Sequence, residues 1–228
     1  MIYKTPKIQI FPNLLGTEKR VQDLQINISE LDWLGYSFGL AKRVAVMNIE
    51  DTRHIPVVYV GVNQDPIDMS MWPYDSWDSY AFWDLMDQSE FIYGGNRSGK
   101  RRYPKIAQPV ALIVCLNNKA ISQEQDYNIT HSICKNEIID KLNNTNMSNG
   151  IFKVTGTLEN IPVEVFDGYD VDNNLMEPNS MLRIEGILTY TQDCVIGTSS
   201  STSTDNVLLL EDGEVFLMED GEEFELED

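Results

Sequence analysis

One continuous apolar run decides the fold of this chain: Gln108-Pro-Val-Ala-Leu-Ile-Val-Cys-Leu116. A run of this length without alternation is typical of a strand covered on both faces, so it predicts a central strand. The segment Met181–Thr191 alternates instead, which predicts a half-buried strand. Its apolar side carries Leu182, Ile184, Gly186, Leu188 and Tyr190, and its other side carries mostly polar residues, Arg183, Glu185, Thr189 and Thr191.

Four further segments are predicted as strands because they are rich in apolar and β-branched residues. They are Ile55–Val62, Ser79–Met86, Ile151–Leu158 and Ile161–Gly168. We expect the last two to pair around Glu159-Asn160, and Glu90–Tyr93 to continue the strand that begins at Ser79.

Two helices are predicted between these strands. Ser29 is a suitable N-cap for the first, which runs to about Met47 with its stripe at Leu31, Leu34, Phe38, Ala41 and Ala45. The second covers Ile129–Asn143, with Ile133, Cys134, Ile138 and Leu142 on one side. The order of elements predicts one α+β domain over residues 1–195, with a mostly antiparallel sheet flanked by two helices.

The composition excludes several classes of protein. The 228 residues are 42% hydrophobic, enough for a sizeable core, and carry a formal charge of −19. Such a charge repels phosphate, which argues against general binding of nucleic acid or of anionic membranes. No apolar run approaches the length of a membrane span, and the N-terminus lacks the pattern of a secretory signal. The three cysteines, Cys115, Cys134 and Cys194, are too few and too far apart for a disulfide framework, so we interpret them as reduced thiols.

The C-terminus has a different composition. Residues 196–205 form a Gly/Ser/Thr-rich linker, and residues 206–228 contain ten acidic residues and no basic one. Two Asp-Gly pairs separate short apolar segments, which predicts a β-meander arm with hairpin turns. We expect the arm to dock on a neighbouring subunit through Val207, Leu209, Val215, Leu217, Phe224 and Leu226. The alternative is a disordered, solubilising tail.

A basic loop follows the acidic segment Asp65–Glu90. We expect it to contact the acidic residues of a neighbouring subunit through Arg97, Lys100, Arg101, Arg102 and Lys105. Gly94–Lys100 also matches a phosphate-loop pattern, so a nucleotide-binding enzyme is an alternative. Arg101 stands where that motif needs Ser or Thr, and Pro104 argues against the helix that should follow.

Aromatic residues cluster between Trp72 and Trp83. We interpret Trp72, Trp77, Phe82 and Trp83 as core or interface residues, with a carbohydrate-binding fibre module as the alternative. Gly35–Gly39 matches the nucleophile-elbow pattern but lies inside the predicted first helix, so we expect no hydrolase site. His54 and His131 are interpreted as surface or turn residues. The sequence therefore predicts no catalytic residue, no metal site and no cofactor.

The run Asp32-Trp-Leu-Gly-Tyr-Ser-Phe-Gly-Leu-Ala-Lys-Arg43, followed by Ile55-Pro-Val-Val-Tyr-Val60, resembles the opening of phage tail-terminator and head–tail connector domains. The strand at Val110–Val114, the second helix and the final strand with its closing Thr191-Gln-Asp-Cys194 follow the same order. The likeness spans roughly residues 15–195 and is closest to the tail ring proteins of crAss-like podoviruses.

This resemblance implies a virion structural protein and not an enzyme. It implies a subunit of a head–tail connector or tail ring that surrounds the DNA path, in the tail or at the head–tail junction of a particle assembled from host-made chains. The expected partners are further copies of the chain, with twelve favoured over six, and the portal or other tail rings. DNA would pass through the lumen without specific binding. No membrane is expected as a partner.

Overall fold

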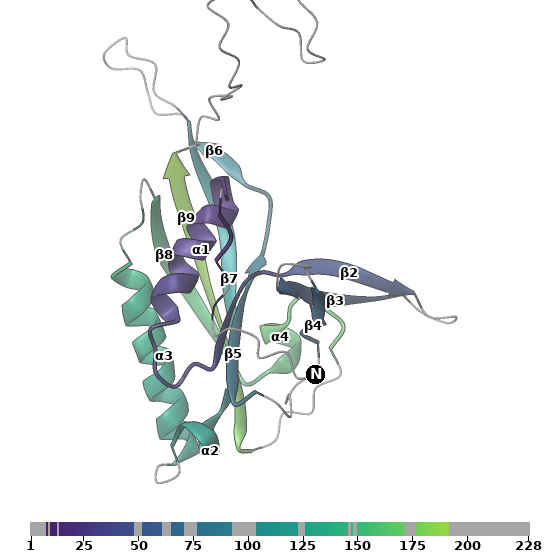
Figure 1. The fold of residues 1–228 in the computed structure, drawn as a ribbon, viewed down its shortest axis with the longest axis vertical. Coiled ribbons are helices and arrows are strands. Elements are labelled where there is room, and N and C mark those ends of the chain that lie inside the picture. The colour runs from purple at the N-terminus through teal and green to yellow at the C-terminus, as the bar shows by residue number, and fades with distance from the viewer. Residues whose placement is uncertain are drawn as a thin grey trace, which may run out of the picture. The chain divides into compact units, whose positions relative to one another are not determined.

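A computed structural model describes residues 8, 10–12, 14–47, 52–60, 65–70, 77–92, 104–122, 126–145, 147, 150–171 and 177–191. The chain divides into two compact units, Met1–Asp193 and Cys194–Asp228, and every described residue belongs to the first. Within it the fold is α+β (Figure 1). The linker 196–205, the arm residues of 206–228, Trp72 and the basic-loop residues Arg97, Lys100, Arg101 and Arg102 lie outside the described residues.

A six-stranded sheet forms the centre of this unit. Five strands follow the order β1-β5-β7-β9-β8, and β6 pairs with β7 beyond the end of β5. All pairs are antiparallel except β1 with β5, which confirms a mostly antiparallel sheet. The strands are β1 Tyr36–Leu40, β5 Ser79–Leu85, β6 Glu90–Ile92, β7 Lys105–Asn117, β8 Gly150–Glu159 and β9 Asn179–Thr191.

The predicted central strand is confirmed. On one edge, β7 pairs with β9 along all 13 of its residues. On the other edge, the second half of β7, Val110–Leu116, pairs with β5. Val110–Leu116 are completely buried, because side chains of both faces enter hydrophobic clusters. Pro109, which cannot donate a backbone hydrogen bond, lies between the part of β7 paired with β5 and the part paired with β6.

The two longer helices cover one face of the sheet (Figure 1). The longer two are α1 Gly16–Ile28 and α3 Tyr127–Asn143, and the shorter two are α2 Asn118–Ile121 and α4 Pro162–Val165. α1 and α3 bury Val21, Leu24, Ile28, Cys134, Ile138 and Leu142 against the sheet in one cluster that also contains Trp83. The predicted second helix is therefore confirmed as α3, although Ile133 is 41% exposed and does not share the buried side.

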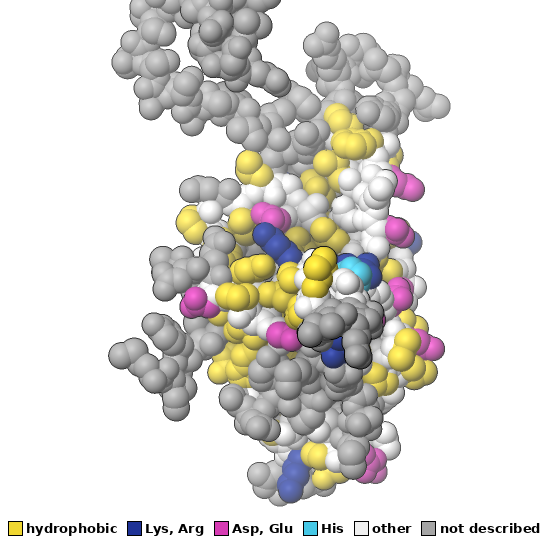
Figure 2. Space-filling view, turned by 90° about the vertical axis from the view of Figure 1, so that its right-hand side faces the viewer, with side chains coloured by type: hydrophobic (Ala, Val, Ile, Leu, Met, Phe, Trp, Pro, Cys, Tyr) yellow, Lys and Arg dark blue, Asp and Glu magenta, His cyan; other side chains and the backbone are white. Residues whose placement is uncertain are grey.

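A three-stranded sheet lies on the opposite face, with strands β2 Lys42–Met47, β3 Thr52–Val60 and β4 Asp65–Asp68 in the order β2-β3-β4. Val58 and Met69 pack with Phe82 of β5 and with Phe166, which follows α4. β2 and β3 form a hairpin whose far end projects away from the large sheet (Figure 1). Figure 2 shows hydrophobic side chains next to Lys and Arg side chains on the side from which this hairpin projects.

The first predicted helix is wrong. Residues 36–47 form β1 and β2, and the chain passes from one sheet to the other through the single residue Ala41, whose N–H donates to the Trp83 carbonyl (2.7 Å). Leu31, Leu34, Phe38 and Ala41 are nevertheless buried, as their spacing suggested. A loop followed by a strand buries them in two different clusters, so the helical spacing did not reflect one helical face.

The strand predicted at Ile161–Gly168 is also wrong. α4 begins there, with Pro162 at a first-turn position where its missing N–H costs no hydrogen bond. Asn160, with a φ of 56°, turns the chain before the helix. Val165 and Phe166 are completely buried under the large sheet, so the apolar content of this segment fills the core without forming a strand.

Two glycines allow close approaches in the large sheet. A Cβ on Gly186 of β9 would clash with the Phe152 ring and lie 2.7 Å from the Lys153 carbonyl. Phe152 can therefore lie across β9 and meet the Trp83 ring edge-on, with centroids 5.7 Å apart. A Cβ on Gly35 would lie 2.9 Å from the Ser79 carbonyl. Gly35, the first residue of the Gly35–Gly39 pattern, is thus required for close packing against β5.

Candidate functional site

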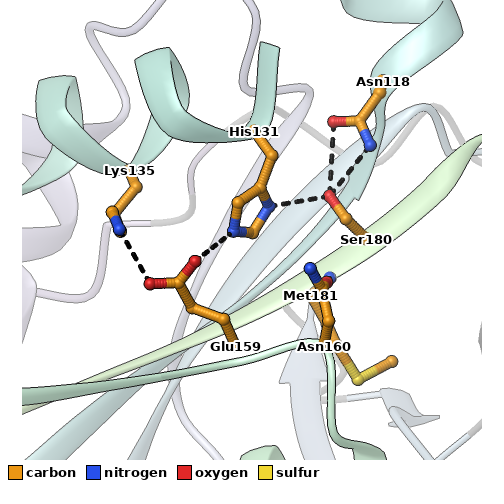
Figure 3. Close-up of polar contacts among 7 residues, drawn as sticks. All are labelled: Asn118, His131, Lys135, Glu159, Asn160, Ser180 and Met181. Atoms are coloured by element: carbon orange, nitrogen blue, oxygen red, sulfur yellow. Dashed lines mark hydrogen bonds and ion pairs between the residues drawn. The ribbon is translucent and has the colours of Figure 1, made fainter. Parts of the chain in front are cut away.

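A cluster of polar side chains joins four elements near one end of the large sheet (Figure 3). His131 comes from α3, Ser180 from β9, Glu159 from β8 and Asn118 from α2. The His131 ring is 5% exposed, and its Nδ1 lies 2.9 Å from Ser180 Oγ while its Nε2 lies 2.9 Å from Glu159 Oε2. Lys135, one turn farther along α3, donates to Glu159 Oε1 (2.8 Å). Each ring nitrogen of His131 thus has a partner.

Ser180 is held from two sides. Asn118 Nδ2 donates to Ser180 Oγ at 3.0 Å, and Asn118 Oδ1 lies 3.2 Å from the same hydroxyl. The next backbone N–H, of Met181, donates to Asn160 Oδ1 (3.1 Å). A hollow of about 180 Å³ adjoins these groups, and Tyr127, Asn128, Glu177 and Asn179 complete its lining.

The charges in the cluster stabilise each other. The hydrogen bond from Lys135 and the nearby His131 hold the pKa of Glu159 below its ordinary value, against the opposing effect of burial. When His131 donates its Nε2 proton to Glu159, Nδ1 accepts the Ser180 hydroxyl proton, and Asn118 supplies the remaining donor. In this arrangement the buried imidazole makes a hydrogen bond through both nitrogens.

Ser180, His131 and Glu159 place a hydroxyl, an imidazole and a carboxylate in the order of a catalytic triad, so we considered whether Ser180 could act as a nucleophile. Ser180 is only 5% exposed and its hydroxyl is shared with Asn118. The N–H of Met181, which would be a natural donor to a developing oxyanion, is already bonded to Asn160. The geometry therefore fits a tie between α3, β8 and β9 better than an acyl-transfer site.

The sequence did not predict this cluster, since His131 was expected at the surface or in a turn. His131, Cys134, Ile138 and Leu142 are all buried on α3, at spacings of a helical stripe. That spacing was the available signal that His131 faces the core. No local pattern joins it to Ser180 or Glu159, because the three residues come from separate elements.

A second buried polar group crosses the opposite face of the sheet. Arg183 of β9 is 1% exposed, contrary to the prediction that it faces away from the core. Its Nε donates to Glu185 Oε1 (2.9 Å), its Nη1 donates to the Val165 carbonyl (3.1 Å), and its Nη1 lies 3.6 Å from Asp84 Oδ2. Tyr169 donates to Asp84 Oδ1 (2.6 Å). These bonds link β5, β9 and the segment around α4.

Burial dominates the electrostatics of this second group. Desolvation raises the pKa of Asp84 above its ordinary value, although Tyr169 and Arg183 both oppose that shift. The pKa of Tyr169 is raised by burial and by the Asp84 carboxylate. A hollow of about 470 Å³ opens beside Asp84, Tyr169 and Arg43. Acids and bases line it together, so it shows no preference for a ligand of either charge.

The structure separates the predicted aromatic residues. Phe82 and Trp83 are completely buried on opposite faces of β5. Trp77 is half-buried and packs against Tyr36 and Phe38, with ring centroids 5.2 Å and 5.3 Å away. These three described residues therefore belong to the core and its margin. Lys105, the one predicted basic-loop residue within the described part, is exposed at the start of β7.

The most exposed large apolar residue of the described β-strands is Met47, at the end of the β2–β3 hairpin. Met47 is 82% exposed and Val46 is 38% exposed. β2 pairs only with β3 among the described strands, so its other edge carries backbone groups that no strand pairs. The strand residues 42–47 and 52–60 include Lys42, Arg43 and Arg53 but no acid. The two strands of the hairpin are thus basic and apolar, on a strongly acidic protein.

No protein-family model and no curated protein matches this chain. Within the described ranges, no helix is long and apolar enough to cross a bilayer. The same residues contain no cluster of three or more His, Cys, Asp or Glu side chains that could hold a metal ion. Cys115 and Cys134 are free thiols, and burial raises the pKa of each to about 12, so they are poor nucleophiles.

Proposed function

We propose that this chain is a virion structural protein, a subunit of a head–tail connector or tail ring that surrounds the path of the DNA. The observation that carries the proposal is the β2–β3 hairpin, which projects from the core with Val46 and Met47 exposed. Exposed apolar side chains at the end of a projecting element do little for the subunit's own stability. They are typical of a contact that forms with another chain.

The sites of buried polar residues support the same conclusion. Ser180 and Arg183 are both enclosed by partners from several elements, so the two clusters stiffen the subunit. A rigid subunit with a projecting hairpin suits a closed ring, in which each copy meets the next through two different surfaces. The resemblance to tail-terminator domains adds to this support; it allows six or twelve copies, and we favour twelve.

The charge of the chain suits a channel for DNA. With a formal charge of −19, an acidic lumen would offer phosphates few cations to exchange for their own counterions. DNA would therefore pass without binding. The portal or another tail ring would contact the subunit above and below, and the chain would reside in the virion at the tail or the head–tail junction.

The test is the assembly state of the full-length chain. Light scattering coupled to size exclusion and electron micrographs should show closed rings far above the 26.0 kDa of one chain. The chain should also co-purify with particles when expressed with its neighbours. A protein that remains monomeric at high concentration and is missing from purified particles would overturn the proposal. Nucleotide binding lost on Lys100→Ala would point to the enzyme class instead.

A further inference from the structure

The outer edge of β2 is a place where another strand can be added. β2 lies at one edge of the small sheet, with β3 as its described neighbour, and the register runs from Lys42↔Val57 to Met47↔Thr52. Proteins normally block such an edge with Pro, with a bulge or with a covering segment. The β2–β3 register is regular throughout, and β2 contains no proline. An extended peptide could therefore pair with it by main-chain hydrogen bonds.

One face of this hairpin is apolar in the middle and basic at both ends. Lys42, Val44 and Val46 alternate on β2, and their cross-strand partners are Val57, Ile55 and Arg53 in that order. The central pair Val44↔Ile55 is partly exposed, while Lys42 and Arg53 stand at opposite ends of the face. Lys42 Nζ lies 5.2 Å from the centroid of the Tyr59 ring. A strand with apolar residues between acids would match this face.

A hollow lies at the base of the same hairpin. It measures about 180 Å³, and its mainly apolar wall includes Leu14, Leu40, Val58 and Tyr59. Lys42 also lines it, so the hollow continues the face described above. Concave apolar sites of this kind receive the large anchor side chains that dominate many protein interfaces.

We propose that β2 and this hollow receive the acidic C-terminal arm, residues 206–228, of a second copy of the chain. The arm has the complementary chemistry, since its apolar segments are flanked by acids, ten in all, and it carries no base. One of its segments adds to the edge of β2 and lays apolar side chains on Val44 and Val46. Its acids pair with Lys42 and Arg53, and one of its phenylalanines, Phe216 or Phe224, fills the hollow.

The choice of a second copy rests on the proposed ring. Each subunit of a ring would give its arm to one neighbour and receive the arm of the other, which is a heterologous contact that closes. Residues 197–205 of the linker are small or polar and give the arm reach beyond its own domain. The outer edge of β2 is then covered in every subunit.

The first experiment changes only the hairpin face of the full-length chain. Val44→Glu with Val46→Glu places two negative charges where the acidic arm would lie, and Val44→Lys with Val46→Lys is the matched control with the same loss of apolar contact. We expect the Glu pair to weaken assembly at least about tenfold more than the Lys pair at low salt, with the gap closing at high salt. Equal effects of the two pairs, with folding intact by circular dichroism, would overturn the inference.

The second experiment tests whether the arm acts between copies. The hairpin variant is mixed with a full-length arm variant, Val215→Glu with Leu217→Glu, when neither assembles alone. The hairpin variant keeps an intact arm, and the arm variant keeps an intact hairpin. One interface can therefore form between them, and sedimentation analysis should show a 1:1 heterodimer. Absence of the heterodimer at about 100 μM would overturn an arm contact between copies. If every variant still forms rings of the same size as the wild-type protein, only this inference is overturned. If the wild-type protein itself never assembles, the proposed ring is overturned.

Discussion

The strand pairs β7–β9 and β2–β3 are both antiparallel and both apolar, yet the chain uses them differently. β7 is buried on both faces and pairs with β9 along its whole length. β2 carries valines and a methionine, but most of its residues are exposed. The difference comes from what covers each pair: helices and a second sheet enclose β7, whereas the far end of the hairpin has no described cover. Apolar content alone therefore does not identify the core of this protein.

The largest loss of stability is expected from a substitution in the core that surrounds β7. Trp83→Ala removes a completely buried ring that packs against Phe152 between α1, α3 and the sheet. We expect the free energy of unfolding to fall by about 3–5 kcal/mol, because the enclosed site cannot collapse around the cavity. Chemical denaturation of the full-length chain measures this change.

Trp77→Ala is the matched control, since Trp77 is the half-buried tryptophan at the margin of the other cluster. Its loss of unfolding free energy should be roughly half that of Trp83→Ala, because solvent already reaches part of its ring. Equal losses for the two variants would contradict the distinction between the centre of the core and its margin.

An intermediate loss of stability is expected at the polar cluster of His131, Ser180 and Glu159, because its ion pair is partly exposed to solvent. Glu159→Gln removes the carboxylate that Lys135 and His131 contact, and we expect a loss of about 1 kcal/mol near neutral pH. The pKa of Glu159 is lowered in the folded protein, so its charge stabilises the fold above the ordinary value of 4.5. That contribution disappears as the pH falls through the folded-state pKa.

The difference in unfolding free energy between wild type and Glu159→Gln should therefore be largest near neutral pH and vanish in the acid range. Denaturation curves at several pH values measure it. Glu30→Gln is the control, because Glu30 pairs with Lys141 at an exposed site and should change stability by less than about 0.5 kcal/mol. A wild-type advantage that stays constant below pH 4 would show that the Glu159 charge plays no part in the tie.

The smallest effect on stability is expected at the tip of the hairpin. Met47→Ser replaces a side chain that is 82% exposed, so the unfolding free energy should change by less than about 0.5 kcal/mol. Assembly should nevertheless weaken measurably in sedimentation experiments, since an apolar contact with another chain is lost. A large loss of stability would mean that Met47 is part of the subunit's own core, and the comparison between the two strand pairs would fail.

The sequence predicted the centre of the fold well and its first 50 residues poorly. Long apolar runs and clean alternation identified β7 and β9, because their period matches the burial that the sheet imposes. The true first helix, α1, buries Val21, Leu24 and Ile28, spaced as a helical stripe, but it begins without a side-chain cap. The predicted helix at 29–47 instead joined a loop and two strands whose buried residues happened to fall at helical intervals.

The polar clusters could not be predicted from local patterns. Ser180 and Arg183 lie three residues apart in β9, so they point to opposite faces of the sheet and meet entirely different partners. Their partners His131 and Asp84, and Glu159 beyond His131, come from other elements, so only the tertiary fold brings them together. The sequence did not predict the exposed edge of β2 either, because residues 42–47 lie within the helix expected to end at Met47.

Ala41 gives the molecule a defined path for mechanical load. A neighbour that pulls on β2 loads its pairing with β3, and the backbone carries the rest of that tension through Ala41 into β1. There the load divides between the peptide bond to Leu40 and the hydrogen bond from Ala41 to Trp83 of β5. β1 is held to β5 by a short parallel pairing with an irregular register, whereas β5 is held to β7 along seven regular pairs. Under traction the β1–β5 seam should yield first and leave the centre of the sheet intact.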